Sequence, residues 1–191
     1  MARTPSTMLD LGTPAPDFHL LNPATGDPVS LSEVRGAKAT VVMFLCNHCP
    51  FVTHVRDEIT RIAADYGQQG VGFVAINAND VANYPDDAPE SMAELAGDLG
   101  WQFPFLFDDD QSVAQSYRAA CTPDFFVFDA DATLAYRGQM DGARPGNDVA
   151  NDGRDLRAAI DALLAGARPD QDQRPSLGCN IKWKPGNEPQ Y

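Results

Sequence analysis

The fold is decided by residues 39–67, which read ATVVMFLCNHCPFVTHVRDEITRIAADYG. The first eight of these residues are mostly apolar or β-branched, a pattern typical of a strand buried on both faces near the centre of an α/β sheet. After Pro50, apolar side chains recur at steps of three or four as far as Tyr66, and Gly67 can end a helix. The Cys-Asn-His-Cys segment at residues 46–49 therefore joins a buried strand to a helix.

This segment has the chemistry of a redox pair. Two intervening residues allow the sulfur atoms of Cys46 and Cys49 to come close enough to bond, and the N-terminus of a helix favours a thiolate. We expect Cys46 to lie at that N-terminus, to act as the nucleophile and to have a pKa below the ordinary thiol value of about 8.5. Cys49 would be the resolving thiol, and His48 would stabilise the Cys46 thiolate with a hydrogen-bond donor or a partial positive charge.

The rest of the chain alternates between strand and helix patterns. Further strands are predicted at residues 17–22, 71–77, 103–108, 124–129 and 133–138, and further helices at residues 89–100, 112–118 and 152–166. Such alternation predicts an α/β fold, with a central mixed β-sheet and helices on both of its faces. We expect one domain over residues 1–191, with residues 1–12 as an N-terminal lead-in and residues 167–191 as an irregular C-terminal tail.

Composition narrows the possible partners. The 191 residues include 27 acidic and 14 basic side chains, a net charge of −13, which argues against nucleic acid or an anionic membrane as a partner. No apolar run approaches the ~18 residues of a membrane span, and the N-terminus lacks the apolar core of a secretory signal. We therefore expect a cytoplasmic protein, in which permanent disulfides are rare and a Cys-x-x-Cys pair is typical of a catalytic or metal-binding site.

Three further stretches carry a family resemblance. They read LGTPAPDF at residues 11–18, CTPDFFVFD at residues 121–129 and SLGCNIKWKPG at residues 176–186. With the cysteine pair, they resemble thioredoxin-fold redoxins of the TlpA/ResA-like and peroxiredoxin branch, and within it a peroxiredoxin-like subfamily with Cys-Asn-His-Cys-Pro at its active site. The resemblance implies a thioredoxin-like fold with Pro123 as a cis-proline opposite the cysteine pair, and with Thr122 and Pro123 binding the substrate.

The activity that this resemblance implies is thiol–disulfide oxidoreduction, with Cys46, Cys49, His48 and Pro123 as the catalytic residues. It implies no cofactor, because electrons would come from a thiol reductant system, and the substrate would be a protein thiol or disulfide, or a peroxide. The alternative is a peroxiredoxin-like antioxidant thiol peroxidase, which would oxidise Cys46 to a sulfenic acid. Peroxiredoxins carry Pro-x-x-x-Thr-x-x-Cys, however, and counting back from Cys46 puts Met43 at the threonine position.

Two cysteines outside the pair, Cys121 and Cys179, are candidates for additional redox thiols, although each also has the character of a small buried apolar residue. Cys179 would act as a resolving thiol if the tail folded back onto the active site. A third possibility is a non-catalytic binding module whose metal site uses residues 46, 48, 49 and His54. Four ligands within nine residues would converge poorly on a tetrahedral ion, so we expect no metal.

Overall fold

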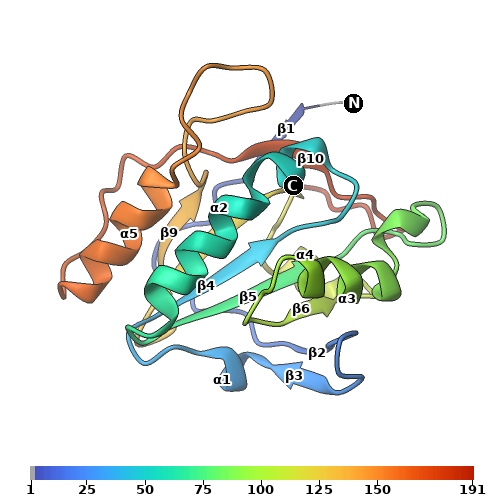
Figure 1. Cartoon of the computed structure of the whole chain (residues 1–191), viewed down its shortest axis with the longest axis horizontal. Helices are drawn as coiled ribbons and strands as arrows, with labels where there is room; N and C mark the ends of the chain where they lie inside the picture. The colour runs from blue at the N-terminus through green and yellow to red at the C-terminus, as the bar shows by residue number, and fades with distance from the viewer. Residues whose placement is uncertain (1–2) are drawn as a thin grey trace.

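The structure is a computed structural model that describes residues 3–191 of the chain (Figure 1). In chain order the elements are β1 (Arg3–Pro5), β2 (His19–Leu21), β3 (Pro28–Ser30), α1 (Leu31–Val34), β4 (Ala39–Phe44), α2 (Pro50–Gly67), β5 (Val71–Asn77), η1 (Pro85–Asp87), α3 (Pro89–Asp98), β6 (Phe105–Phe107), α4 (Ser112–Ser116), β7 (Cys121–Thr122), β8 (Asp124–Asp129), β9 (Leu134–Gly138), α5 (Arg154–Leu164) and β10 (Leu177–Asn180). The described strands form two sheets.

The larger sheet is the predicted mixed sheet, with the strand order β3-β2-β6-β5-β4-β8-β9. Strand β4 runs parallel to β5 and antiparallel to β8. Strand β8 turns back into β9 as the predicted antiparallel hairpin. Every residue of β4 is buried, which explains why its sequence is a continuous apolar and β-branched run rather than an alternation of apolar and polar residues.

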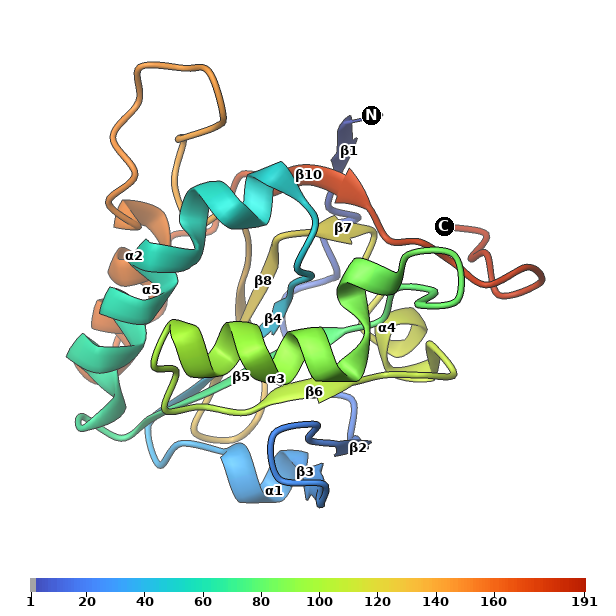
Figure 2. The ribbon, with the colours of Figure 1, turned by 45° about the vertical axis from the view of Figure 1, so that its right-hand side comes forward.

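Helices cover both faces of this sheet, as predicted (Figure 2). Side chains alternate along β4, so Val41 and Met43 belong to one buried cluster and Val42 and Phe44 belong to the other. The first cluster includes side chains from α2, α3 and α5, and the second includes side chains from α1 and α4. The α/β, thioredoxin-like fold class predicted from the sequence is therefore confirmed.

A small second sheet joins the two ends of the described chain, in the order β1-β10-β7. Strand β10 pairs Cys179 with Arg3 on one side and with Thr122 on the other. The fit is tight, because a Cβ atom added to Gly178 would lie 2.0 Å from the carbonyl oxygen of Thr122. Glycine is therefore required where the tail meets β7.

The prediction of an irregular tail at residues 167–191 is wrong at β10, and the lead-in at residues 1–12 contains β1. Residues 1 and 2 of the lead-in lie outside the described residues. Strands of two to four residues have too few positions to show a period of two, and their pairing depends on partners far away in the sequence, because Cys179 pairs with Arg3 and with Thr122. The sequence pattern alone therefore contained no signal for this sheet.

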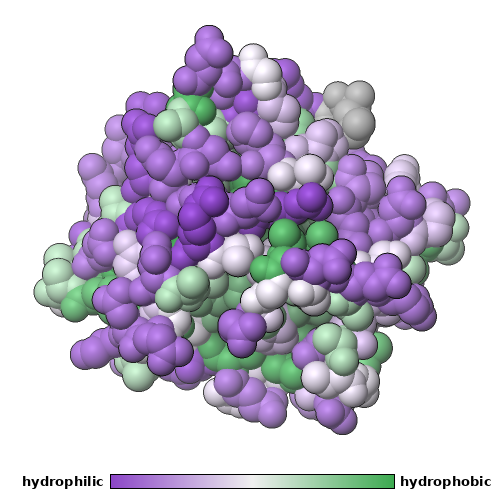
Figure 3. Space-filling model, in the orientation of Figure 1, coloured by the Kyte–Doolittle hydropathy of each residue, from purple (hydrophilic) through white to green (hydrophobic). Residues whose placement is uncertain are grey.

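The face seen in Figure 3 is mostly hydrophilic, and its hydrophobic residues are concentrated in the lower half. A groove lined by α1, α2 and the segment at residues 100–104 includes the side chains of Val34, Ala63, Trp101 and Phe103.

No helix within residues 3–191 is both long enough and apolar enough to cross a membrane.

Candidate active site

The cysteine pair lies where β4 passes into α2, but the helix begins later than expected. Helix α2 starts at Pro50, and Cys49 is its N-cap residue. The prediction that Cys46 lies at the helix N-terminus is therefore wrong, because Cys46 lies in the loop that precedes the cap. Proline is favoured at the first helical position, where its missing N–H is not needed, so Pro50 was the signal for the correct start.

Three sulfur atoms and one threonine meet at this junction. The Sγ atom of Cys49 lies 2.8 Å from Sγ of Cys179, and as a thiol it donates to the carbonyl oxygen of Thr122 at 3.3 Å. The Sγ atom of Cys46 lies 3.2 Å from Oγ1 of Thr122, and the side chains of Cys46 and Cys49 are hydrogen-bonded to each other. The Thr122–Pro123 peptide bond is cis, as the resemblance implied.

Charge at the sulfur atoms is distributed differently from the prediction. The pKa of Cys49 falls to about 5, because its thiolate accepts hydrogen bonds from the thiols of Cys46 and Cys179 and from the backbone N–H of Val52 in the first turn of α2. The pKa of Cys46 rises well above its ordinary value, because Cys46 donates to Cys49, is buried and lies near Asp87. The expected low pKa of Cys46 is therefore wrong, and the helix N-terminus favours the thiolate of Cys49.

Cys179 has the opposite acid–base character to Cys49. Its pKa rises to about 12, because it is buried and because it donates to Cys49 and feels the negative charge there, while the ammonium of Lys182 acts in the other direction. Cys46, Cys49 and Cys179 are all buried, with at most 1% of each residue exposed. The directions of these shifts favour the ionised form at Cys49 and the protonated forms at Cys46 and Cys179, where little surface is exposed.

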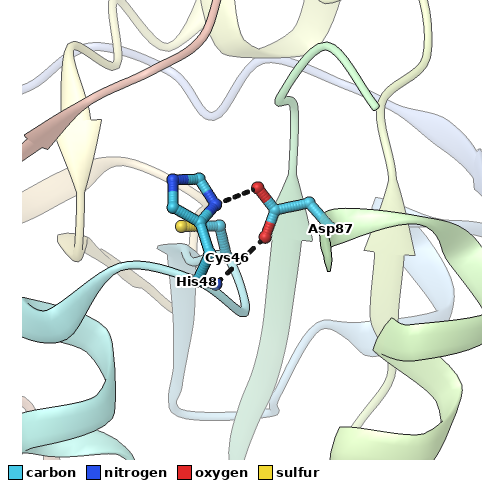
Figure 4. Close-up of side chains that lie close together, drawn as sticks. All are labelled: Cys46, His48 and Asp87. Carbon is cyan, nitrogen blue, oxygen red and sulfur yellow. Dashed lines mark hydrogen bonds and ion pairs between the residues drawn. The ribbon is translucent and has the colours of Figure 1, made fainter. Parts of the chain in front are cut away.

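A buried carboxylate that the sequence analysis missed holds the loop between the cysteines (Figure 4). Asp87 in η1 accepts hydrogen bonds from the backbone N–H groups of Asn47 at 2.7 Å and His48 at 3.2 Å, from Nδ1 of His48 at 2.5 Å and from Nδ2 of Asn79 at 2.8 Å. The ring of His48 stacks on Tyr84, with 5.5 Å between the ring centroids. Asp87 therefore fixes both the backbone of the loop and the orientation of His48.

The geometry does not favour a metal ion at this place. Donor atoms of Cys46, His48 and Asp87 lie within 4.8 Å of one another, but both oxygens of Asp87 already accept two hydrogen bonds each, and Nδ1 of His48 is one of the donors. The candidate set that included His54 is not brought together within residues 3–191. Instead, Nε2 of His54 is buried on α2 without a hydrogen-bond partner among the described residues.

Cys121 lies beside the site without joining the three sulfur atoms. Its Sγ donates weakly to the carbonyl oxygen of Pro123 at 3.7 Å, and its pKa rises well above the ordinary value because the thiol is buried and lies near Asp124. No sulfur–sulfur contact of Cys121 is found within the described chain. Of the two additional candidate thiols, the structure brings Cys179 to the pair and leaves Cys121 as a packed core residue.

Comparisons with known proteins place the chain in a family and a reaction class. The chain is 52% identical to an uncharacterized conserved protein from Geobacillus kaustophilus of known crystal structure; the match covers 97% of this chain and 98% of that one, with a TM-score of 0.96. It is 24% identical to the thiol:disulfide interchange protein DsbE of Allochromatium vinosum, over 71% of this chain and 68% of that protein. It is 27% identical to the thiol-disulfide oxidoreductase ResA of Geobacillus kaustophilus, over 69% of this chain and 70% of that protein. Residues 10–154 match the Redoxin family model, and the chain belongs to the Redoxin family.

Proposed function

We propose that this protein is a thiol–disulfide oxidoreductase in which Cys49 is the nucleophile and Cys46 is a resolving thiol. The proposal rests on the position of Cys49. It is the N-cap residue of α2, and its sulfur contacts both the thiol of Cys46 and the carbonyl oxygen of Thr122, the residue before the cis-proline. The similarity to proteins named DsbE and ResA supports the same reaction class. The roles of the two cysteines are exchanged relative to the sequence-based hypothesis.

The reaction begins at Cys49. Its thiolate attacks one sulfur of a substrate disulfide, forms a mixed disulfide with that sulfur and releases the other sulfur as a thiolate. A pKa of about 5 keeps Cys49 ionised at neutral pH, and the N–H of Val52 stabilises the charge before attack. Because Cys49 is buried, neighbouring residues must move aside before a substrate disulfide can reach its sulfur.

Resolution requires a proton to leave Cys46. The Cys46 thiolate then attacks the Cys49 sulfur, a Cys46–Cys49 disulfide forms, and the substrate leaves as a thiolate that takes up one proton. The protein has given two electrons to the substrate, and a thiol reductant restores the dithiol. His48, which is held by Asp87 and has a ring nitrogen within 4.8 Å of the Cys46 sulfur, is the group that we assign to accept the Cys46 proton, through one bridging water.

Thr122 and Pro123 form the wall opposite the cysteine pair. The Thr122 hydroxyl contacts Cys46, and the Thr122 carbonyl contacts Cys49. Both sulfurs therefore border the position that a substrate backbone would take beside the cis-proline. The substrates in this proposal are protein thiols and disulfides, and the reductant is another dithiol protein or a small thiol.

Reduction of insulin by dithiothreitol, with and without the protein, tests the proposed function. The Cys49→Ala variant should lose all catalysis, whereas Cys46→Ala keeps the nucleophile, cannot form the Cys46–Cys49 disulfide and should turn over slowly. The matched control is Cys121→Ala, which removes an equally buried thiol outside the group of three and should retain catalysis. An active Cys49→Ala variant with an inactive Cys46→Ala variant would return the nucleophile to Cys46.

The cytoplasmic location remains a prediction from composition. It is tested by fractionating cells that express the untagged full-length protein and by measuring the in vivo redox state of its cysteines. A fully oxidised cysteine pair in an exported fraction would contradict it.

A further inference from the structure

We infer that Cys49 has two alternative disulfide partners, Cys46 and Cys179, and that Cys179 is a second resolving thiol supplied by the C-terminal tail. This inference rests on the proposed role of Cys49 as the nucleophile. Cys179 lies outside the residues that match the Redoxin model, which end at residue 154. It is therefore an element that this chain adds to the common part of the fold.

The tail holds the Cys179 sulfur against Cys49 before any oxidation. The two Sγ atoms are 2.8 Å apart, and a disulfide requires about 2.05 Å, so the bond can form without a large movement of either backbone. Strand β10 is paired on both sides, with β1 and with β7. The close approach of Gly178 to Thr122 keeps β10 at this position.

The acid–base state of Cys179 suits a resolving thiol. Its pKa is raised partly by the negative charge of Cys49. When Cys49 forms a mixed disulfide with a substrate, that charge disappears, so the Cys179 thiol loses its proton more readily just when its attack is needed. The ammonium of Lys182, three residues further along the tail, favours the Cys179 thiolate.

Resolution by Cys179, followed by exchange with Cys46, takes two steps. Cys179 gives up its proton and attacks the Cys49 sulfur of the mixed disulfide; a Cys49–Cys179 bond forms, and the substrate leaves as a thiol that carries a proton. Cys46 can then attack the same Cys49 sulfur, forming Cys46–Cys49 and returning Cys179 to the thiol. The second step is an exchange within the protein that consumes no oxidant or reductant. Cys49 thus exchanges its disulfide partner between Cys179 in the tail and Cys46 in the loop.

This exchange makes a quantitative prediction. Because the two disulfide forms have the same oxidation level, their ratio must stay constant when the redox potential of the surrounding buffer changes. Only the total amount of oxidised protein should change. Two disulfides that did not share Cys49 could, in contrast, form in the same molecule, and their proportions would differ at different potentials.

The experiment equilibrates the full-length protein in a series of glutathione buffers, stops exchange with acid, alkylates the remaining thiols and maps the tryptic peptides by mass spectrometry. Cys46 and Cys49 lie on one tryptic peptide, residues 39–56, because Lys38 and Arg56 flank them, whereas Cys179 lies on another. A Cys46–Cys49 bond is thus internal to one peptide, and a Cys49–Cys179 bond joins two. We expect both products, in a ratio that does not depend on the glutathione buffer.

Three variants complete the test. Cys46→Ala should form only Cys49–Cys179, Cys179→Ala should form only Cys46–Cys49, and the control Cys121→Ala should form both in the wild-type ratio. If Cys179 is alkylated throughout in the wild type and in Cys46→Ala, the inference is wrong, while insulin reduction through Cys46–Cys49 would leave the proposed function intact. If Cys49 joins neither partner and insulin is not reduced, both fail.

Discussion

Nδ1 of His48 lies 2.5 Å from Oδ2 of Asp87, a carboxylate with no exposed surface. The same carboxylate accepts hydrogen bonds from both backbone N–H groups between the cysteines. One charged group therefore holds the loop in its conformation and also places a negative charge beside it. Its negative charge is one of the causes that raise the pKa of Cys46, after the hydrogen bond to Cys49 and burial. Asp87 therefore favours the protonated form of Cys46 and leaves the ionised form to Cys49.

The first prediction follows from that charge. Replacing Asp87 with Asn keeps a side-chain acceptor for the loop N–H groups but removes the negative charge. We therefore expect Asp87→Asn to lower the pKa of Cys46, measured by ultraviolet thiolate absorbance in a Cys49→Ala, Cys179→Ala background. Asp86→Asn changes the neighbouring exposed carboxylate and should leave that titration unchanged. An unchanged titration in Asp87→Asn would show that the Asp87 charge does not act on Cys46.

The second prediction concerns His48. If its ring accepts the proton of Cys46, His48→Ala should slow the resolving step about 100-fold in a Cys179→Ala background, in which Cys46 is the remaining resolving thiol. This factor is within the usual range for the loss of a general base. The initial attack by Cys49 should keep its rate. Single-turnover experiments with a chromogenic disulfide separate the two steps, because the first thiol is released before the mixed disulfide resolves. His54→Ala, at the other histidine of this region, is the control, and equal slowing of both steps would assign His48 a purely structural role.

The third prediction concerns pH. The folded-state pKa of Cys49, about 5, lies below the ordinary thiol value of about 8.5, so folding favours its deprotonated form. The ionised Cys49 therefore stabilises the fold fully above pH of about 8.5, and this stabilisation is lost as pH falls towards 5. The free energy of unfolding of the wild type, minus that of Cys49→Ala, should therefore increase as pH is raised from about 5 to about 8.5. Urea unfolding at a series of pH values measures this difference.

Alkylation provides an independent check of the same pKa. The iodoacetamide labelling rate of Cys49 should rise as pH increases through about 5 and stay level at neutral pH, because the labelling rate follows the thiolate fraction. Cys46 and Cys179 should label slowly throughout that range, since their pKa values are raised. A Cys49 rate that still climbed between pH 7 and 9 would contradict a low pKa at the helix N-cap.

Long contiguous patterns explain why most of the large sheet could be predicted. Strands β4, β5, β8 and β9 and helices α2, α3 and α5 have local signals, such as a buried apolar run or apolar side chains at helical spacing. The fold class follows from those signals alone. The second sheet could not be predicted, because β1, β7 and β10 are two to four residues long and are extended only because they pair with one another.

Candidate site residues that are close in the sequence could be recognised from it, whereas residues that meet only through the fold could not. The cysteine motif and Thr122–Pro123 were recognisable as motifs, and Cys179 was a candidate only because it is a cysteine. Asp87 follows Cys49 by 38 residues in a loop that contains several other polar residues, and no spacing distinguishes it from Asp86. The proposed exchange of roles between Cys46 and Cys49 depends on where α2 begins, which Pro50 indicates and the cysteine spacing does not.

The last prediction concerns peroxide. Counted from Cys49, the Pro-x-x-x-Thr-x-x-Cys motif of peroxiredoxins puts Cys46 at the threonine position and Val42 at the proline position. A thiol is a weaker hydrogen-bond donor than a hydroxyl, so nothing at position 46 orients a peroxide oxygen beside the thiolate. Wild-type protein should therefore react with hydrogen peroxide like an ordinary low-pKa thiol, with a rate that is linear in peroxide concentration.

Replacing Cys46 with Thr restores the missing hydroxyl at the position where a peroxiredoxin has it. Because one preorganised donor contributes on the order of 10²–10³ to rate in other enzymes, we expect Cys46→Thr to react with peroxide at least about tenfold faster than Cys46→Val, which has the same shape without the hydroxyl. Stopped-flow competition against a thiol of known reactivity measures both. Equal rates in the two variants would contradict the argument from the hydroxyl. Saturable, rapid oxidation of the wild type would show a peroxide site that does not depend on position 46, and would favour the peroxidase alternative.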